Sequence, residues 1–328
     1  MGSESMNASL VHAFISISIV SAVLFALMIF SALVFRKVQR CAIWYSFCAS
    51  WLAFSASFSL LSFAGQQFNS SQDRDLCLAQ AGLVYAAPFL VGCTSTALVA
   101  QLLSTILDTI SPNTTGVNKR SLFVRILAIV TPWSIWLAVL IGVLLSSSTH
   151  RDGVILSPNS TYCVVSSSPV PRLTAVFTTI LCIIILSLEV VIAALLFRHR
   201  AVKDLFKQSV IMATRVFVFT GVVLTAAVTG LSFVLTERRG AAFDVMISVV
   251  PLGTAIIFGS QPDLWQGYLG WIPIQLRCSW HGRRRVSGPR TDVLQPQGTI
   301  SIHQPTLVIG PHTSMQEGHI MEVEPSSS

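Results

Sequence analysis

Side chains that commonly perform catalysis are scattered through this sequence rather than clustered. No group of His, Cys, Asp or Glu has the spacing of a metal site, no glycine-rich loop is placed to hold a phosphate, and no nucleophile stands beside a base. The seven histidines lie mostly in loops and in the C-terminal segment: His12, His150, His199, His281, His303, His312 and His319. We therefore expect neither enzymatic activity nor a metal or cofactor.

Two of the seven cysteines differ from the others in their surroundings. Most of the others lie inside apolar runs, where a small sulfur-containing side chain is ordinary packing. Cys77 and Cys163 fall in polar stretches instead. In an oxidising compartment this pair could close a disulfide bond that orders a long loop. The alternative is two unrelated free thiols.

The composition places these residues in a membrane protein. The chain has 328 residues, of which 52% are hydrophobic and only 11% charged, and its mean hydropathy is +0.70. A soluble protein of this length has about 25% charged residues. The net charge of +7 does not indicate nucleic acid, because the basic residues stand in short clusters between apolar runs.

Seven apolar stretches are long enough to cross a bilayer, which takes roughly 20 residues in a helix. The third is the most polar, and because polar side chains usually face the interior of a membrane bundle, we expect that helix to be central. The sequence therefore predicts an all-α integral membrane protein, a seven-transmembrane helix bundle with helices at about 10–35, 43–64, 77–105, 126–146, 173–197, 209–235 and 242–259.

The lysines and arginines predict the orientation of these helices. If the N-terminus (1–9) lies outside, most of the 21 basic residues fall on the cytoplasmic side and the exceptions are Arg74, Arg151, Arg172, Arg238 and Arg239. Cytoplasmic loops carry the excess of Lys and Arg, so N-out and C-in is favoured. The glycosylation sequons at Asn69 and Asn159 then face outside, and Asn159 is the better candidate.

The pattern resembles a G-protein-coupled receptor: seven spans, a cysteine at the start of the third, and a partner cysteine in the loop after the fourth. The stretches "CLAQAGLVYAAP" (77–88) and "FGSQPDLW" (258–265) resemble the orphan seven-helix receptors of basidiomycete fungi, which are loosely related to the cyclic-AMP-receptor-like and secretin-like classes. The resemblance covers about residues 10–275. The Asp-Arg-Tyr triplet of rhodopsin-class receptors is absent, and without a lysine in the seventh span no retinal Schiff base can form there.

Polar and aromatic residues within the spans are candidates for ligand binding. Glu189 is a carboxylate inside the fifth span, and Asp244 stands at the outer mouth of the seventh. Three more, together with Trp133, indicate a partly aromatic cavity in the outer half of the bundle: Gln80, Tyr85 and Trp136. Ordinary core packing, a carboxyl bonded to a hydroxyl, and a first-turn carboxylate favoured by the helix dipole are the competing explanations.

Basic residues near the cytoplasmic ends are candidates for coupling to a G protein. The third inner loop, "RHRAVKDLFKQ", contributes Arg198, Arg200, Lys203 and Lys207. Asp108 and Arg215 could pair to hold the third and sixth helices together in a resting state, although Arg215 extending to the interface is the alternative.

The last two segments lie beyond the seventh span. Residues 260–276 begin with the capping pattern Ser-x-x-Asp and predict a short amphipathic eighth helix in the membrane interface. Residues 277–328 are polar and predict a disordered cytoplasmic tail, in which Ser287 follows three arginines and is a candidate for phosphorylation.

The expectation is thus a plasma-membrane receptor, with residues 10–259 as its transmembrane domain, that binds a small-molecule or peptide ligand among its helices and signals to a heterotrimeric G protein. Its other partners would be membrane lipids, and not nucleic acid. The alternatives are a small seven-span transporter or lipid-translocating exporter, and a membrane scaffold without a ligand.

Overall fold

The computed structural model describes residues 2–34, 40–68, 73–110, 118–149, 154–157, 159–165, 170–198, 203–236 and 241–261. These residues form seven α-helices and one two-stranded antiparallel sheet, in the order α1 (Gly2–Val34), α2 (Ala42–Phe63), α3 (Arg74–Ile110), α4 (Asn118–Thr149), β1 (Val154–Leu156), β2 (Cys163–Val165), α5 (Val170–Arg198), α6 (Lys203–Thr236) and α7 (Ala241–Gly259).

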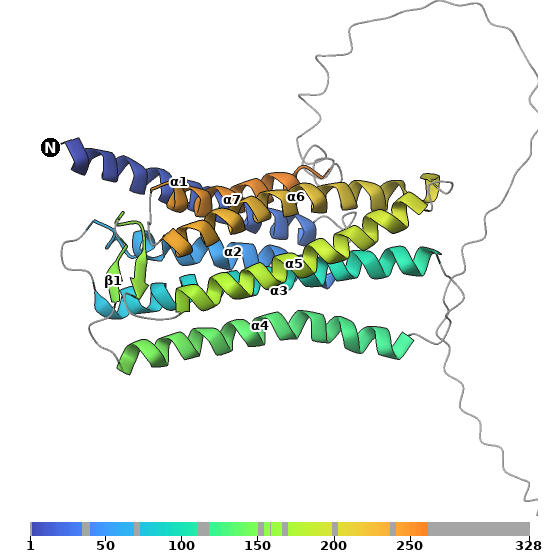
Figure 1. The fold of residues 1–328 in the computed structure, drawn as a ribbon, viewed down its shortest axis with the longest axis horizontal. Helices are drawn as coiled ribbons and strands as arrows, with labels where there is room; N and C mark the ends of the chain where they lie inside the picture. The colour runs from blue at the N-terminus through green and yellow to red at the C-terminus, as the bar shows by residue number, and fades with distance from the viewer. Residues whose placement is uncertain are drawn as a thin grey trace, which may run out of the picture. The chain divides into compact units, whose positions relative to one another are not determined.

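Successive helices run in opposite directions, so the bundle has two ends (Figure 1). One carries the β-hairpin and the start of α1, and we call it the hairpin end. The other carries the end of α7, and we call it the tail end. α3 packs against α2, α4, α5, α6 and both strands, while α1 packs against α2 and α7. The third helix is therefore the central one, as its polar sequence predicts.

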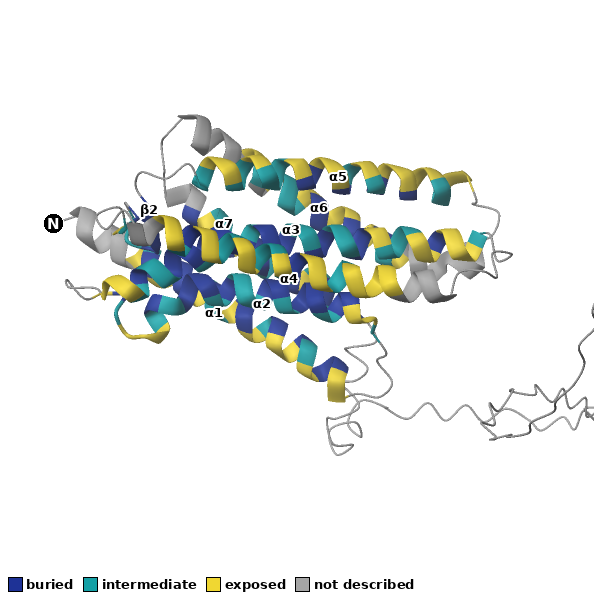
Figure 2. Ribbon diagram, turned by 90° about the horizontal axis from the view of Figure 1, so that it is seen from below, coloured by how far each residue is buried: buried dark blue, intermediate teal, exposed yellow. Residues whose placement is uncertain are grey.

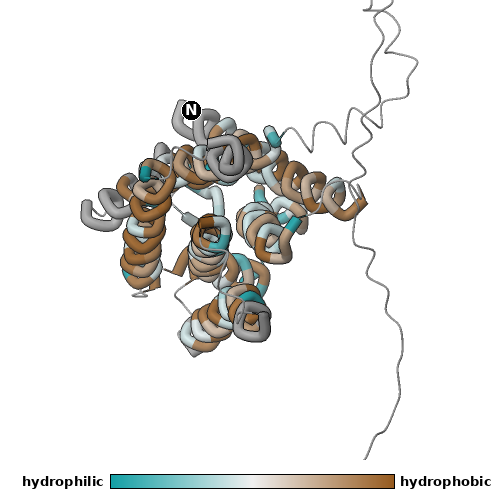
Figure 3. Tube along the Cα trace, turned by 90° about the vertical axis from the view of Figure 1, so that its right-hand side faces the viewer, coloured by the Kyte–Doolittle hydropathy of each residue, from teal (hydrophilic) through white to brown (hydrophobic). Residues whose placement is uncertain are grey.

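The distribution of polarity is the reverse of that in a soluble protein. Large apolar side chains are exposed on the outside of the bundle, with Phe123, Leu145 and Val190 each more than 60% exposed. Serines and other polar residues are buried, among them Ser21, Ser50 and Gln80 with no exposed surface. Figure 2 shows the outer faces of α4 and α5 largely exposed, and Figure 3 shows that hydrophobic residues make up much of the helices. Such an exterior matches lipid rather than water.

Five helices are long and apolar enough to cross a membrane. They are α2, α3, α5 and the segments Ser9–Val34 of α1 and Phe123–Ser146 of α4. Within the described parts of α6 and α7, the apolar segments Ile211–Thr225 and Asp244–Gly259 are shorter. The structure is thus that of a helical, membrane-embedded protein.

Buried hydroxyl groups can be tolerated because they bond to their own helices. Ser18 donates to the carbonyl of Phe14, Ser57 to that of Ala53 and Thr254 to that of Val250, each about one turn back. Such bonds satisfy the donor without a partner helix. Between helices, Ser50 Oγ lies 2.8 Å from Thr94 Oγ1 and links α2 to α3.

A small residue lies at a close contact in the centre of the bundle. A Cβ added to Gly92 of α3 would lie 2.5 Å from Leu181 Cδ1 of α5, so a larger residue there would require the end of the Leu181 side chain to move. Toward the tail end, Phe47, Trp51, Phe219 and Phe258 interlock edge to face across α2, α6 and α7, with centroid separations of 4.9–6.3 Å.

Each predicted span lies within an observed helix to about one residue, but several helices are longer than predicted: α1 begins at Gly2 rather than about 10, α4 at Asn118 rather than about 126, and α6 at Lys203 rather than about 209. The third helix runs from Arg74 to Ile110 rather than about 77–105, because a helix that satisfies its own backbone can continue past the apolar run.

The all-α prediction is confirmed for the bundle, and the loop after α4 adds a short hairpin in which β1 and β2 pair with Ile155 opposite Val164. The predicted eighth helix, from residue 262 on, and the tail 277–328 lie outside the described residues.

An arginine on the outer face of α5 should distinguish a lipid-facing surface from a hydrated one. Ile183 is 59% exposed near the middle of the helix, and Phe197 is 64% exposed in its last turn. We expect Ile183→Arg to reduce the yield of folded, membrane-inserted protein, because a central arginine costs about 3 kcal/mol in insertion. Phe197→Arg should be tolerated, since its head group can reach the interface. Equal yields of the two variants would contradict a lipid-facing α5.

Candidate functional site

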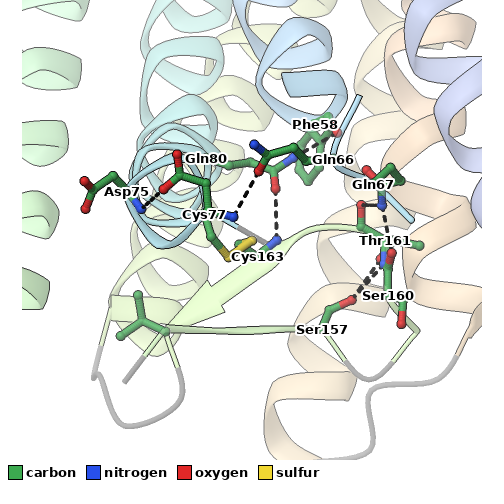
Figure 4. The surroundings of a disulfide bond; sticks show 12 residues. Phe58, Gln66, Gln67, Asp75, Cys77, Gln80, Ser157, Ser160, Thr161 and Cys163 are labelled. Carbon is green, nitrogen blue, oxygen red and sulfur yellow. Dashed lines mark hydrogen bonds between the residues drawn. A yellow bond between two sulfur atoms is a disulfide. The ribbon is translucent and has the colours of Figure 1, made fainter. Parts of the chain in front are cut away.

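The β-hairpin is fixed to α3 by a covalent bond and two hydrogen bonds, and Figure 4 shows the covalent bond and the contact with Gln80. Cys77 in the first turn of α3 forms a disulfide with Cys163, the first residue of β2. The backbone N–H of Cys163 donates to Gln80 Oε1 at 3.1 Å, and that of Val165 donates to Tyr85 Oη at 3.4 Å. Successive turns of α3 thus hold strand β2 along its length.

Gln80 also connects this strand to α2. Its Nε2 donates to the carbonyls of Phe58 at 3.2 Å and Ser57 at 3.4 Å, and its side chain is completely buried. One amide therefore joins α2, α3 and the hairpin. Because an amide has two donors and an acceptor oxygen, it can serve all three contacts at once.

The turn of the hairpin is held from the opposite side, by α7. Thr161 Oγ1 donates to Asp244 Oδ2 at 2.9 Å, and Asn159 Nδ2 donates to the same oxygen at 2.8 Å. Asp244 is 3% exposed and Thr161 is fully buried. Hydrogen bonds to a carboxylate are stronger than neutral ones, so this contact is a strong polar link between the hairpin and α7.

A glutamine beyond the end of α2 completes the support of this turn. α2 ends in a glycine turn in which Gly65, at φ +68°, donates to Ser62 O and Gln66 donates to Leu61 O. This turn places Gln67 under the hairpin, where its Nε2 donates to the carbonyls of Ser160 and Thr161 at 2.8 and 3.2 Å. Ser160 itself has φ +58°, a strained conformation for a residue with a side chain.

The five predicted ligand-binding residues therefore do not form one site. Gln80, Tyr85 and Asp244 share the hairpin end and use their polar atoms to hold the hairpin. Glu189 lies elsewhere, buried between α5 and α6, where Thr220 Oγ1 donates to it.

The aromatic part of the predicted cavity is misplaced. Trp136 contacts Trp133, whose Nε1 donates to Ser46 Oγ at 3.0 Å, and Ser46 lies in the first turns of α2, toward the tail end. The prediction grouped both tryptophans with Gln80 because it had no means of fixing the levels of α3 and α4 relative to each other.

The predicted coupling residues have different environments. Arg215 Nη2 donates to the carbonyl of Ser260 at 3.0 Å, which links α6 to the residue that follows α7. Asp108 is exposed on α3, and Arg198 is exposed at the end of α5. The structure thus gives Arg215 a contact at the end of α7 and not the predicted ion pair with Asp108. Arg200 and the side chains of Lys203 and Lys207 lie outside the described residues.

The predicted modification sites are described only in part. Asn69 and Ser287 lie outside the described residues. Asn159 and Thr161, the two ends of one sequon, both bond to Asp244. In the folded protein this sequon forms the hairpin turn and faces α7.

Sequence reasoning missed Gln67, Thr161 and Tyr162. The sequence shows Thr161 only as the third residue of the sequon at Asn159 and does not predict its contact with α7. Gln67 and Tyr162 carry no local signal, because their roles depend on which loop covers which helix end. No protein-family model matches the chain, and no curated protein is similar to it in sequence.

Replacing Gln80 by leucine should destabilise the hairpin end. Gln80→Leu would leave two carbonyls and one N–H without their partner, and we expect a loss of about 2–4 kcal/mol in stability, measured as a lower melting temperature of the purified protein in detergent. Gln101→Leu is the matched control, since Gln101 lies on the same helix and is only partly buried. Equal losses for both variants would show that Gln80 does not hold the hairpin.

Proposed function

We propose that this chain is a seven-transmembrane receptor of the G-protein-coupled kind, located in the plasma membrane with its hairpin end outside. It senses a small-molecule or peptide ligand and signals to a heterotrimeric G protein. The observation that carries the proposal is the bridge that the hairpin makes between α3 and α7: Cys77 and Gln80 hold one side and Asp244 the other. The resemblance of the sequence to such receptors supports it as well.

The seven-span topology is part of this proposal. α6 and α7 have 34 and 19 residues, long enough to cross at 1.5 Å per residue. The distribution of basic residues supports the orientation, because it places the hairpin end outside and the tail end in the cytoplasm. An oxidising exterior also suits a disulfide at the hairpin end.

The contacts of α7 offer a route from one end of the bundle to the other. Near its first turn α7 binds the hairpin through Asp244, and just past its last turn Ser260 accepts a hydrogen bond from Arg215 of α6. A ligand that shifts the hairpin end of α7 would change the contact with α6 at the tail end. Such a ligand acts by favouring one of two arrangements of the helices.

The test of this proposal is coupling to a Gα subunit. Purified protein in lipid nanodiscs should accelerate nucleotide exchange on at least one member of a panel of Gα subunits, and disrupting the bridge with Cys163→Ser should change that rate. A protein that leaves exchange unaltered across the panel, yet moves substrate or lipid across vesicles, would instead be the seven-span transporter or exporter.

Removing Arg215 should raise basal signalling. Arg215→Ala deletes the hydrogen bond to Ser260, so the tail ends of α6 and α7 should separate more readily and basal nucleotide exchange should increase several-fold. Asp108→Asn is the control, because Asp108 is exposed and the structure gives Arg215 a different partner. If Asp108→Asn raises the basal rate as much as Arg215→Ala does, the α6–α7 contact is not the restraint.

A further inference from the structure

One aromatic residue of the hairpin is inserted into the helix bundle. Tyr162 is only 5% exposed although it belongs to a loop. Its ring lies edge to face against Phe58 of α2 at a centroid distance of 5.3 Å and is nearly parallel to Phe14 of α1 at 6.1 Å. Phe14 and Phe58 are themselves in edge-to-face contact at 5.7 Å. We call the space that these two rings form the Tyr162 slot.

The slot continues into the transmembrane helices. The same buried cluster includes Val11 and Ile15 of α1 and Val84 of α3, and Ile247 of α7 packs against it. A side chain that no helix contributes is thus part of a buried cluster to which four helices contribute.

Tyr162 is held on one side by a covalent bond and on the other by hydrogen bonds that can break and re-form. The covalent attachment is the disulfide at the next residue, Cys163. The hydrogen bonds lie on the other side of Tyr162, where Thr161 and Asn159 bind Asp244 and where Gln67 donates to the carbonyls of Ser160 and Thr161. Loss of the Asp244 contacts would leave this segment with fewer restraints and so raise the fraction of molecules in which Tyr162 leaves the slot while its neighbour stays tethered.

We propose that the Tyr162 slot is a ligand-binding site for a small phenol, and that the Tyr162 side chain occupies this site when no ligand is bound. The chemical class follows from the occupant: a planar aromatic ring with one hydroxyl fits between the faces and edges of Phe14 and Phe58 as the tyrosine side chain does.

The disulfide gives Tyr162 a high effective concentration in the slot. A free phenol therefore binds in proportion to the fraction of molecules in which Tyr162 has left, and any change that weakens the Asp244 contacts raises the apparent affinity. The slot is the ligand site of the proposed receptor and in that sense rests on the proposed function.

The test is a titration of the purified full chain in detergent with p-cresol, which is the tyrosine side chain as a free molecule, followed by ligand-observed NMR. We expect Asp244→Ala, which keeps Tyr162, to bind p-cresol about tenfold more tightly than the wild type. The double variant Asn159→Ala/Thr161→Val removes the same contacts from the hairpin side and should match it. Ser248→Ala, one turn along α7 from Asp244, is the control and should leave the affinity unchanged, because Ser248 Oγ donates to its own helix at Val245 O.

A further variant tests whether p-cresol binds in the Tyr162 slot. Phe14→Leu in the Asp244→Ala background removes one ring of the slot and should reverse the gain in affinity. Tyr162→Ala should also bind p-cresol. If it does, but Asp244→Ala and Asn159→Ala/Thr161→Val bind p-cresol no better than the wild type, then Tyr162 is a fixed core residue and the proposal is overturned. It is overturned as well if no variant binds p-cresol.

This experiment separates the slot from the proposed signalling function. Binding is measured without a G protein, so a failure of nucleotide exchange leaves the binding result intact. Conversely, an absence of p-cresol binding leaves the coupling to a Gα subunit to be judged by nucleotide exchange.

Discussion

The polar groups of this bundle depend on the protein itself for hydrogen bonds, because the lipid around it offers none. This constraint explains why serines bond to the carbonyl one turn back, and why Gln80, which has no exposed surface, has three backbone partners. It also explains the position of α3. The helix with the most polar side chains is the one that other helices surround, since only there can those side chains be satisfied.

The same constraint makes the hairpin an integral part of the fold. β2 supplies N–H groups to Gln80 and Tyr85, and the turn supplies donors to Asp244. Without the hairpin, these three buried side chains would lose those partners at the end of a membrane bundle. The hairpin therefore supplies hydrogen-bond partners that buried side chains of α3 and α7 need. The disulfide between Cys77 and Cys163 adds to this by limiting how far the loop can separate from α3 in the unfolded chain.

Sequence reasoning predicted the elements well and their mutual contacts poorly, for a physical reason. An apolar run long enough to span a bilayer predicts its own helix from its own residues. The partner of a polar residue depends on the rotation and level of two helices, which the periodicity of one helix does not fix. The pairing of Asp108 with Arg215 rests on opposite charge and on the expected adjacency of the third and sixth helices, whereas Arg215 bonds to the carbonyl of Ser260, a backbone group with no signal in the sequence. Asp244 was recognised as a carboxylate at a helix start, but its partners lie 83 and 85 residues away in the chain.

The two attachments of the hairpin differ in strength, and that difference determines which motions the fold allows. A disulfide keeps β2 on α3 in every folded state, whereas two hydrogen bonds to Asp244 can break and re-form. Movement at the hairpin end should therefore be easier at the turn and at α7 than at Cys163. Because α7 also contacts α6 through Ser260 and Arg215, α7 is the helix through which a displacement of its first turn would reach the tail end.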